Sequence, residues 1–218
     1  MRTPRNFVRD ILVRGTFCLS LVAVAAVGAV GPTAAETITS TDQHQGRSLD
    51  VAKRFISDLA QDSMQVLRKA DDNAEQKQAK FEKLWNEGVS FDTISRFVLG
   101  RYWRAATPEQ QERYQSLFAA SIIRTSVNAL TSLDQEPLKI VDARLAGKKD
   151  MLVSSRIIRV GGPSIPVDWR VRVIDGRYQV IDVMIEGVSM ALTKRSEYSA
   201  VVKNQGLEGL LDALQSTI

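Results

Sequence analysis

Apolar residues change their spacing near residue 138, which divides the chain into a helical first part and a strand-rich second part. Before this point they recur every three or four positions, the period of a helix with one buried face. Thr107, Pro108 and Gln110 have the form of a helix start, with a capping threonine, a proline in the first turn and a glutamine that completes a capping box. Helices are predicted to begin after Ser48, Asn73, Ser90 and Thr107.

Four strand-length runs follow, separated by short connectors. They span residues 138–145, 153–160, 165–174 and 177–186. Because the connectors are short, neighbouring strands must be antiparallel, and Asp175-Gly176 is typical of a two-residue hairpin turn. Ser189 can cap a further helix to Lys203, and a last short helix follows Gly206. The predicted fold class is α+β: an antiparallel four-stranded meander sheet with helices packed on one face.

The last run, from Val180 to Ile185, is apolar on both of its alternating faces. A strand with one wet face alternates apolar and polar residues, so this strand is expected to be covered on both sides, by other parts of the protein or by a ligand. Tyr102-Trp103 with flanking arginines suits a rim where a polar headgroup meets an apolar cavity, and it equally suits a surface cation–π pair. The residues expected to line the space, whether pocket or filled core, are Phe91, Ile94, Val98, Tyr102, Trp103, Phe118, Ile122, Val153, Ile157, Val167, Trp169, Val171, Ile181, Val183, Ile185 and Leu192.

Residues 1–35 have the pattern of a secretory signal peptide. Four arginines precede an uncharged apolar run over residues 17–30, and small residues follow for cleavage near Ala35. The apolar run is shorter than the roughly 20 residues that span a bilayer, which favours cleavage over a retained membrane anchor. We expect a flexible lead-in over residues 36–47 and a single domain over residues 48–218.

Charge and reactive residues exclude several function classes. The whole chain has a formal net charge of +4, but the leader holds four Arg and one Asp, so the remainder carries 25 basic against 24 acidic residues. This balance predicts no nucleic-acid partner. The only cysteine, Cys18, lies in the leader, and the only histidine, His44, lies in the lead-in. The composition therefore argues against a catalytic triad, a zinc site and disulfides, and no metal or cofactor is expected.

Carboxylates on the predicted strands are the remaining candidates for catalysis. Asp168, Asp182 and Glu186 lie on or beside strands with one apolar face, where a shielded carboxylate can act as a general base on a hydrophobic substrate. The alternative is that the two aspartates point outward and form ion pairs with neighbouring arginines. The arginines in reach are Arg156, Arg170 and Arg172. A third possibility is an interaction module of the cell envelope with a filled core and no ligand.

Three ordered blocks carry a family resemblance. They comprise residues 91–104 with 106–110, residues 161–170, and residues 182–189 with 195–198, and the first contains Gly100-Arg101-Tyr102-Trp103-Arg104. Together they resemble the MlaC family of periplasmic phospholipid-binding proteins, also called toluene-tolerance auxiliary proteins. The resemblance extends over about residues 55–214, and its three blocks make it more specific than a single short motif.

The resemblance implies a carrier in the Gram-negative periplasm that takes lipid acyl chains into a cavity between sheet and helices. It implies exchange of phospholipid with an inner-membrane ABC transporter complex bearing a substrate-binding ring, and with an outer-membrane lipoprotein complex. No catalytic residue is implied, the apolar residues named above become lipid contacts, and we expect a monomer. Trp169 stands where the family usually has tyrosine. Residues 191–196 look closer to a hopanoid-associated relative, so a carrier of hopanoid, a triterpenoid lipid, is the alternative.

Overall fold

Local capping sequences set several helix starts in the structure, a computed structural model that describes residues 36–133, 136–159 and 161–218. The helices are α1 (Glu36–Arg68), α2 (Ala74–Gly88), α3 (Phe91–Leu99), the 3-10 helix η3 (Gly100–Ala105), α4 (Pro108–Ser132) and α5 (Met190–Gln215). Asn73 and Thr107 cap α2 and α4 as predicted. Each side-chain oxygen accepts a hydrogen bond from the backbone N–H three residues later, at 2.8 Å and 3.3 Å. The predicted signal peptide, residues 1–35, lies outside the described residues.

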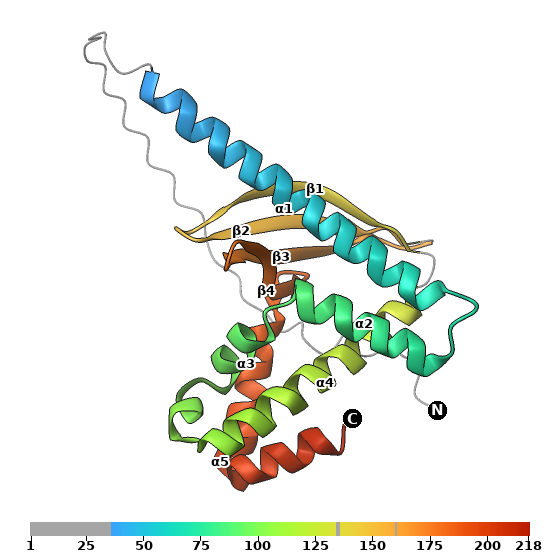
Figure 1. Ribbon diagram of the computed structural model, residues 1–218, viewed down its shortest axis with the longest axis vertical. Helices are drawn as coiled ribbons and strands as arrows, with labels where there is room; N and C mark the ends of the chain where they lie inside the picture. Colours follow the sequence, from blue (N-terminus) through green and yellow to red (C-terminus); the bar gives the residue numbers. More distant parts are fainter. Residues whose placement is uncertain (1–35, 134–135, 160) are drawn as a thin grey trace.

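Helix α1 begins earlier than the sequence predicts. Its first residue is Glu36 rather than the residue after Ser48, so residues 36–47 continue the helix instead of forming a separate lead-in. This stretch contains no proline, and a helix that is already formed extends at little cost into neighbouring polar residues. The first turns of α1 project beyond the sheet (Figure 1).

The sheet is an antiparallel meander of five strands rather than the predicted four. The strands are β1 (Leu138–Ala146), β2 (Asp150–Ile157), β3 (Ile165–Ile174), β4 (Arg177–Ile185) and β5 (Val188–Ser189), and they lie side by side in chain order. Glu186 and Gly187 turn the chain with φ of 52° and 81°, which pairs Ile185 with Val188. A strand of two residues shows no alternation, so the sequence pattern could not reveal β5.

A β-bulge explains part of the apolar run in β4. Val171 pairs with Val180 while Arg170 pairs with Asp182, so Ile181 is the extra residue of the bulge. As a result, Val180 and Val183 lie on the same face of the sheet and join the same group of apolar side chains. The consecutive apolar positions therefore reflect a change of phase within the strand as well as burial.

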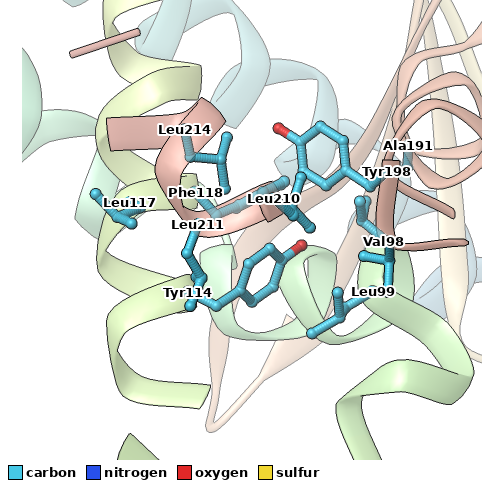
Figure 2. Close-up of a cluster of buried hydrophobic side chains, with 11 residues drawn as sticks. Val98, Leu99, Tyr114, Leu117, Phe118, Ala191, Tyr198, Leu210, Leu211 and Leu214 are labelled. Atoms are coloured by element: carbon cyan, nitrogen blue, oxygen red, sulfur yellow. The ribbon is translucent and has the colours of Figure 1, made fainter. Parts of the chain in front are cut away.

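Two clusters of buried side chains form the core. The sheet cluster lies between the sheet and α1, which crosses the strands in Figure 1. Its buried members are Ala52, Ile56, Leu59, Val89, Met151, Val153, Val171 and Val180. The helical cluster, shown in Figure 2, is built by α3, α4 and α5. Its buried members are Val98, Leu99, Tyr114, Leu117, Phe118, Ala191, Tyr198, Val202, Leu210, Leu211 and Leu214.

Candidate functional site

The structure divides the predicted lining residues between the two clusters instead of gathering them around one space. Val98 and Phe118 are buried in the helical cluster, with Tyr102, Trp103 and Ile122 packed against it. Val153 and Val171 are buried in the sheet cluster, with Trp169 and Val183 packed against it. The remaining predicted lining residues belong to neither cluster: Ile157, Val167, Ile181, Ile185 and Leu192. The helix across the sheet is α1, whose residues Ala52, Ile56 and Leu59 were not among the predicted lining residues.

Phe91 and Ile94 are the predicted site residues that contact both clusters. They lie on α3, which the backbone holds against β4: the Ser90 N–H donates to the Val180 carbonyl oxygen at 2.9 Å, and Val89 forms a parallel bridge with Val180. The place where α3 meets the inner face of the sheet is therefore the boundary between the clusters.

Apolar side chains at this boundary are incompletely covered. Phe91, Ile94, Trp169 and Val183 are half-buried, and Ile185 is 37 % exposed although Val167, its partner on the neighbouring strand, is buried. Trp169 pairs with Val183 across the two strands, and Val167 pairs with Ile185, which aligns these side chains on one face. We call this group, Phe91, Ile94, Trp169, Val183 and Ile185, the α3–β4 seam. Apolar area that the protein itself leaves partly open is where an apolar ligand gains most from binding.

The polar atom of Trp169 is satisfied inside the protein. Its Nε1–H donates to the Ser155 hydroxyl at 3.0 Å, and this hydroxyl donates to the Val167 carbonyl oxygen at 2.7 Å. These bonds fix the orientation of the indole ring, so the ring presents a rigid apolar surface to the seam.

Asp182, one of the carboxylates considered for catalysis, is neither a free general base nor an ion-pair partner of an arginine among the described residues. Asp182 accepts hydrogen bonds from the backbone N–H groups of Val183 and Ala191 and from the Ser189 hydroxyl, at 2.9, 3.0 and 2.6 Å. It therefore caps the start of α5 and joins it to β4. Glu186 occupies the exposed turn before β5.

The arginines of the outer sheet face do not pair with Asp168 or Asp182. Arg172 forms a two-pronged ion pair with Asp150, at 2.6 and 3.1 Å, and Arg170 lies 3.2 Å from the same carboxylate. This ion pairing accompanies the extension of β2, which begins at Asp150 rather than at the predicted Val153. The prediction that these arginines pair with Asp168 or Asp182 was therefore wrong, because their acidic partner is Asp150.

Two surface cavities lie in the helical part of the molecule. One, of about 220 Å³, lies between α4 and α5 and is lined by Ile122, Tyr198, Val201 and Leu214 among others. The other, of about 300 Å³, is lined by residues of α3, η3 and α5, including Tyr102 and Arg195. Sequence reasoning did not place Arg195 and Ser199 beside Tyr102, although both line this cavity and Ser199 forms a hydrogen bond with Tyr102. Their spacing of four residues, which places both on one face of a helix, was the available signal.

The described residues contain neither a metal-binding cluster nor a membrane-spanning helix. Within them, no three His, Cys, Asp or Glu side chains gather as a metal would require. None of the described helices has a stretch long and apolar enough to cross a bilayer.

The fold is a known small α+β fold. It resembles a solved phospholipid-binding protein from Ralstonia solanacearum in complex with a phospholipid, with a TM-score of 0.65 and 24 % identity over 76 % of this chain and 96 % of that one. The MlaC protein family matches residues 51–216, and the chain belongs to this family.

Curated relatives agree with the family match. Toluene tolerance protein ttg2D of Pseudomonas putida is 26 % identical over 54 % of this chain, and the intermembrane phospholipid transport system binding protein MlaC of Haemophilus influenzae is 24 % identical over 59 %. The aligned part of the chain spans 55 % and 62 % of the lengths of these two relatives.

Proposed function

We propose that this protein is a periplasmic carrier that binds phospholipid, with the acyl chains entering the α3–β4 seam. The observation that carries the proposal is the incompletely covered apolar seam in a chain of the MlaC family. The names of the relatives and the phospholipid held by the structure of similar fold support the same ligand class. The structural use of Asp182 favours a carrier over an enzyme.

The energetics of acyl-chain burial explain why such a carrier needs partners. Each buried methylene contributes about 0.8 kcal/mol, so about ten buried methylenes contribute about 8 kcal/mol, which corresponds to a dissociation constant near the micromolar range. Longer burial makes unaided release slow. We propose that an inner-membrane ABC transporter complex and an outer-membrane lipoprotein complex separate α3 and α5 from the sheet to exchange the lipid.

Native mass spectrometry of protein secreted to the periplasm tests this function directly. The wild-type protein is expected to carry lipid, and fragmentation of the released ligand distinguishes phospholipid from hopanoid. Ligand-free protein that stays empty after incubation with phospholipid vesicles would contradict the proposal and would favour an envelope interaction module with a filled core.

A matched pair of variants locates the lipid. Ile185→Glu introduces a charge into the seam, whereas Val173→Glu introduces the same charge on the same face at the far end of β3; the two side chains are 37 % and 45 % exposed. Ile185→Glu should reduce lipid loading about ten-fold or more because a bound acyl chain would have to desolvate the carboxylate. Val173→Glu should load like wild type. Equal loading of the two variants would remove the seam as the binding site.

A further inference from the structure

A cavity of about 300 Å³ opens between the α3–η3 corner and α5, beside the helical cluster. Val98 and Leu99, which belong to the buried set shown in Figure 2, form its floor. Its polar walls are formed by Arg101, Tyr102, Arg195 and Ser199. The cavity therefore offers cationic and hydroxyl donors to a ligand.

Aromatic side chains hold both guanidinium groups in place. Cζ of Arg101 lies 4.9 Å from the ring centre of Tyr102, and Cζ of Arg195 lies 5.0 Å from that of Phe97. One N–H of Arg101 donates to the Tyr102 hydroxyl at 2.9 Å, and one N–H of Arg195 donates to the Phe97 carbonyl oxygen at 3.1 Å. Each guanidinium keeps further N–H donors for a ligand, and stacking reduces the entropy lost when they bind it.

Neither guanidinium has a carboxylate partner within the described part of the chain. The neighbouring acidic residues are engaged elsewhere: Asp92 pairs with Arg96 at 2.8 Å, and Glu197 pairs with Lys194 at 2.8 Å. The positive charge on the cavity walls is therefore not neutralised by the protein itself.

Gly100 allows the Arg195 side chain to lie against the backbone of the α3–η3 corner. Its φ of 58° lies in the region that disfavours residues with a side chain, and a Cβ built on it would lie 3.1 Å from Cζ of Arg195. Glycine at this position thus leaves room for the guanidinium at the edge of the cavity.

The surroundings of Tyr102 show that the cavity favours negative charge on oxygen. The hydrogen bond from Arg101, the bond to Ser199 and the positive charges of Arg101 and Lys203 lower the pKa of the Tyr102 hydroxyl below its ordinary value. An anionic oxygen of a ligand in the same place would gain from the same groups.

We propose that this cavity binds a phosphate group through Arg101 and Arg195, with the Ser199 hydroxyl as a further donor. Arginine presents paired N–H groups that match two phosphate oxygens, and such charge-assisted bonds are stronger than neutral ones. A phosphate can come from a lipid headgroup or from free phosphate, and the experiment below distinguishes the two.

The assignment of the phosphate to a lipid headgroup rests on the proposed function. Phe91 and Ile94 of the seam and Val98 of the cavity floor recur at helical spacing on α3. At 1.5 Å per residue, Phe91 and Val98 are about 10 Å apart along the helix axis. A lipid whose chains enter the seam can therefore reach the cavity with its phosphate.

The test compares two lipids that differ only in the phosphate-bearing headgroup. Wild type, the double variant Arg101→Gln/Arg195→Gln and the matched control Arg104→Gln, an exposed arginine of η3 outside the cavity lining, are incubated with vesicles carrying phosphatidylethanolamine or diacylglycerol of the same chains. Loading is read by native mass spectrometry. Binding of inorganic phosphate to delipidated protein is measured by calorimetry in parallel.

The double variant should lose about ten-fold or more in phosphatidylethanolamine loading and should load diacylglycerol like wild type, since each charge-assisted hydrogen bond contributes about a factor of ten. The control should match wild type with both lipids. Arg195→Lys, which keeps the charge but loses the fork, should show an intermediate loss.

The other outcomes are equally decisive. Weakened binding of inorganic phosphate with unchanged lipid loading supports the phosphate site but overturns the headgroup as its source. Unchanged behaviour of the double variant with every probe overturns the site. Wild type that loads neither lipid contradicts the proposed function, while the calorimetric comparison still tests the cavity.

Discussion

Replacing Asp182 with alanine removes the side chain that joins β4 to the start of α5. The carboxylate accepts hydrogen bonds from the N–H groups of Val183 and Ala191 and from the Ser189 hydroxyl, at 2.9, 3.0 and 2.6 Å. Hydrogen bonds to a charged group contribute about 1.5–3 kcal/mol each, but water can reach this half-buried site and replace part of them. We expect a loss of about 3 kcal/mol in the free energy of unfolding, which lowers Tm by about 6–12 °C for a chain of this size.

Asparagine at position 182 separates a structural role from a catalytic one. Its carbonyl oxygen can accept from both backbone N–H groups, and its amide can donate to the Ser189 oxygen, so Asp182→Asn should cost about 1 kcal/mol. Lipid loading of the folded variant should equal that of wild type. Thermal and urea unfolding followed by circular dichroism measure the stability of both variants.

Asp168 provides the control for these measurements. It is half-buried on the neighbouring strand, and among the described residues it has no ion-pair or hydrogen-bond partner. Asp168→Ala should therefore change stability by less than about 0.5 kcal/mol. If Asp182→Ala unfolds at the wild-type temperature, the capping role is refuted. If Asp182→Asn abolishes function in a fully stable protein, a purely structural role for Asp182 is refuted.

Two further predictions concern the helical cluster and the kink in α5. Burial raises the pKa of Tyr114 and of Tyr198. The contribution of these groups to stability is therefore fully present below the ordinary tyrosine pKa near 10 and is lost as the pH rises above it, because the unfolded chain releases these protons first. Tyr114→Phe should reduce this loss of stability at alkaline pH, as measured by urea unfolding at several pH values, and an unchanged pH dependence would contradict the prediction. Gly206, at φ 74° and ψ 177°, occupies a conformation open almost only to glycine. Gly206→Ala should therefore lower the free energy of unfolding by about 1–3 kcal/mol. Gly162→Ala, whose Cβ would meet nothing within 4 Å, should lower it by less, and equal losses in thermal unfolding would refute the backbone strain at Gly206.

Features that depend on neighbouring residues could be predicted from the sequence. The capping boxes at Asn73 and Thr107 and the Asp175-Gly176 turn are satisfied by side chains and backbone atoms within a few positions. The family resemblance, which is confirmed, could likewise be read from short blocks of residues at fixed spacing along the chain. The early start of α1 was missed because Gly46 and the capping residue Ser48 have the form of a helix boundary, whereas the helix continues through both.

Features that depend on distant partners required the tertiary structure. The β-bulge at Ile181 exists only relative to the register of β3, so the sequence showed an apolar run without its cause. Likewise, periodicity identified many of the buried side chains, but it also included Leu192, which is exposed, and it could not assign Phe118 and Val153 to different clusters.

By itself, the sequence determined the starts of the helices after Asn73 and Thr107, four strands of the antiparallel meander, the family and many of the buried apolar residues, because each follows from local hydrogen bonding and hydrophobic periodicity. Only the tertiary structure decided that α1 covers the sheet, that the seam lies between two separate clusters, and that Arg101 and Arg195 share one cavity. These are choices among many partners of equal hydrophobicity or charge, and packing in three dimensions makes them.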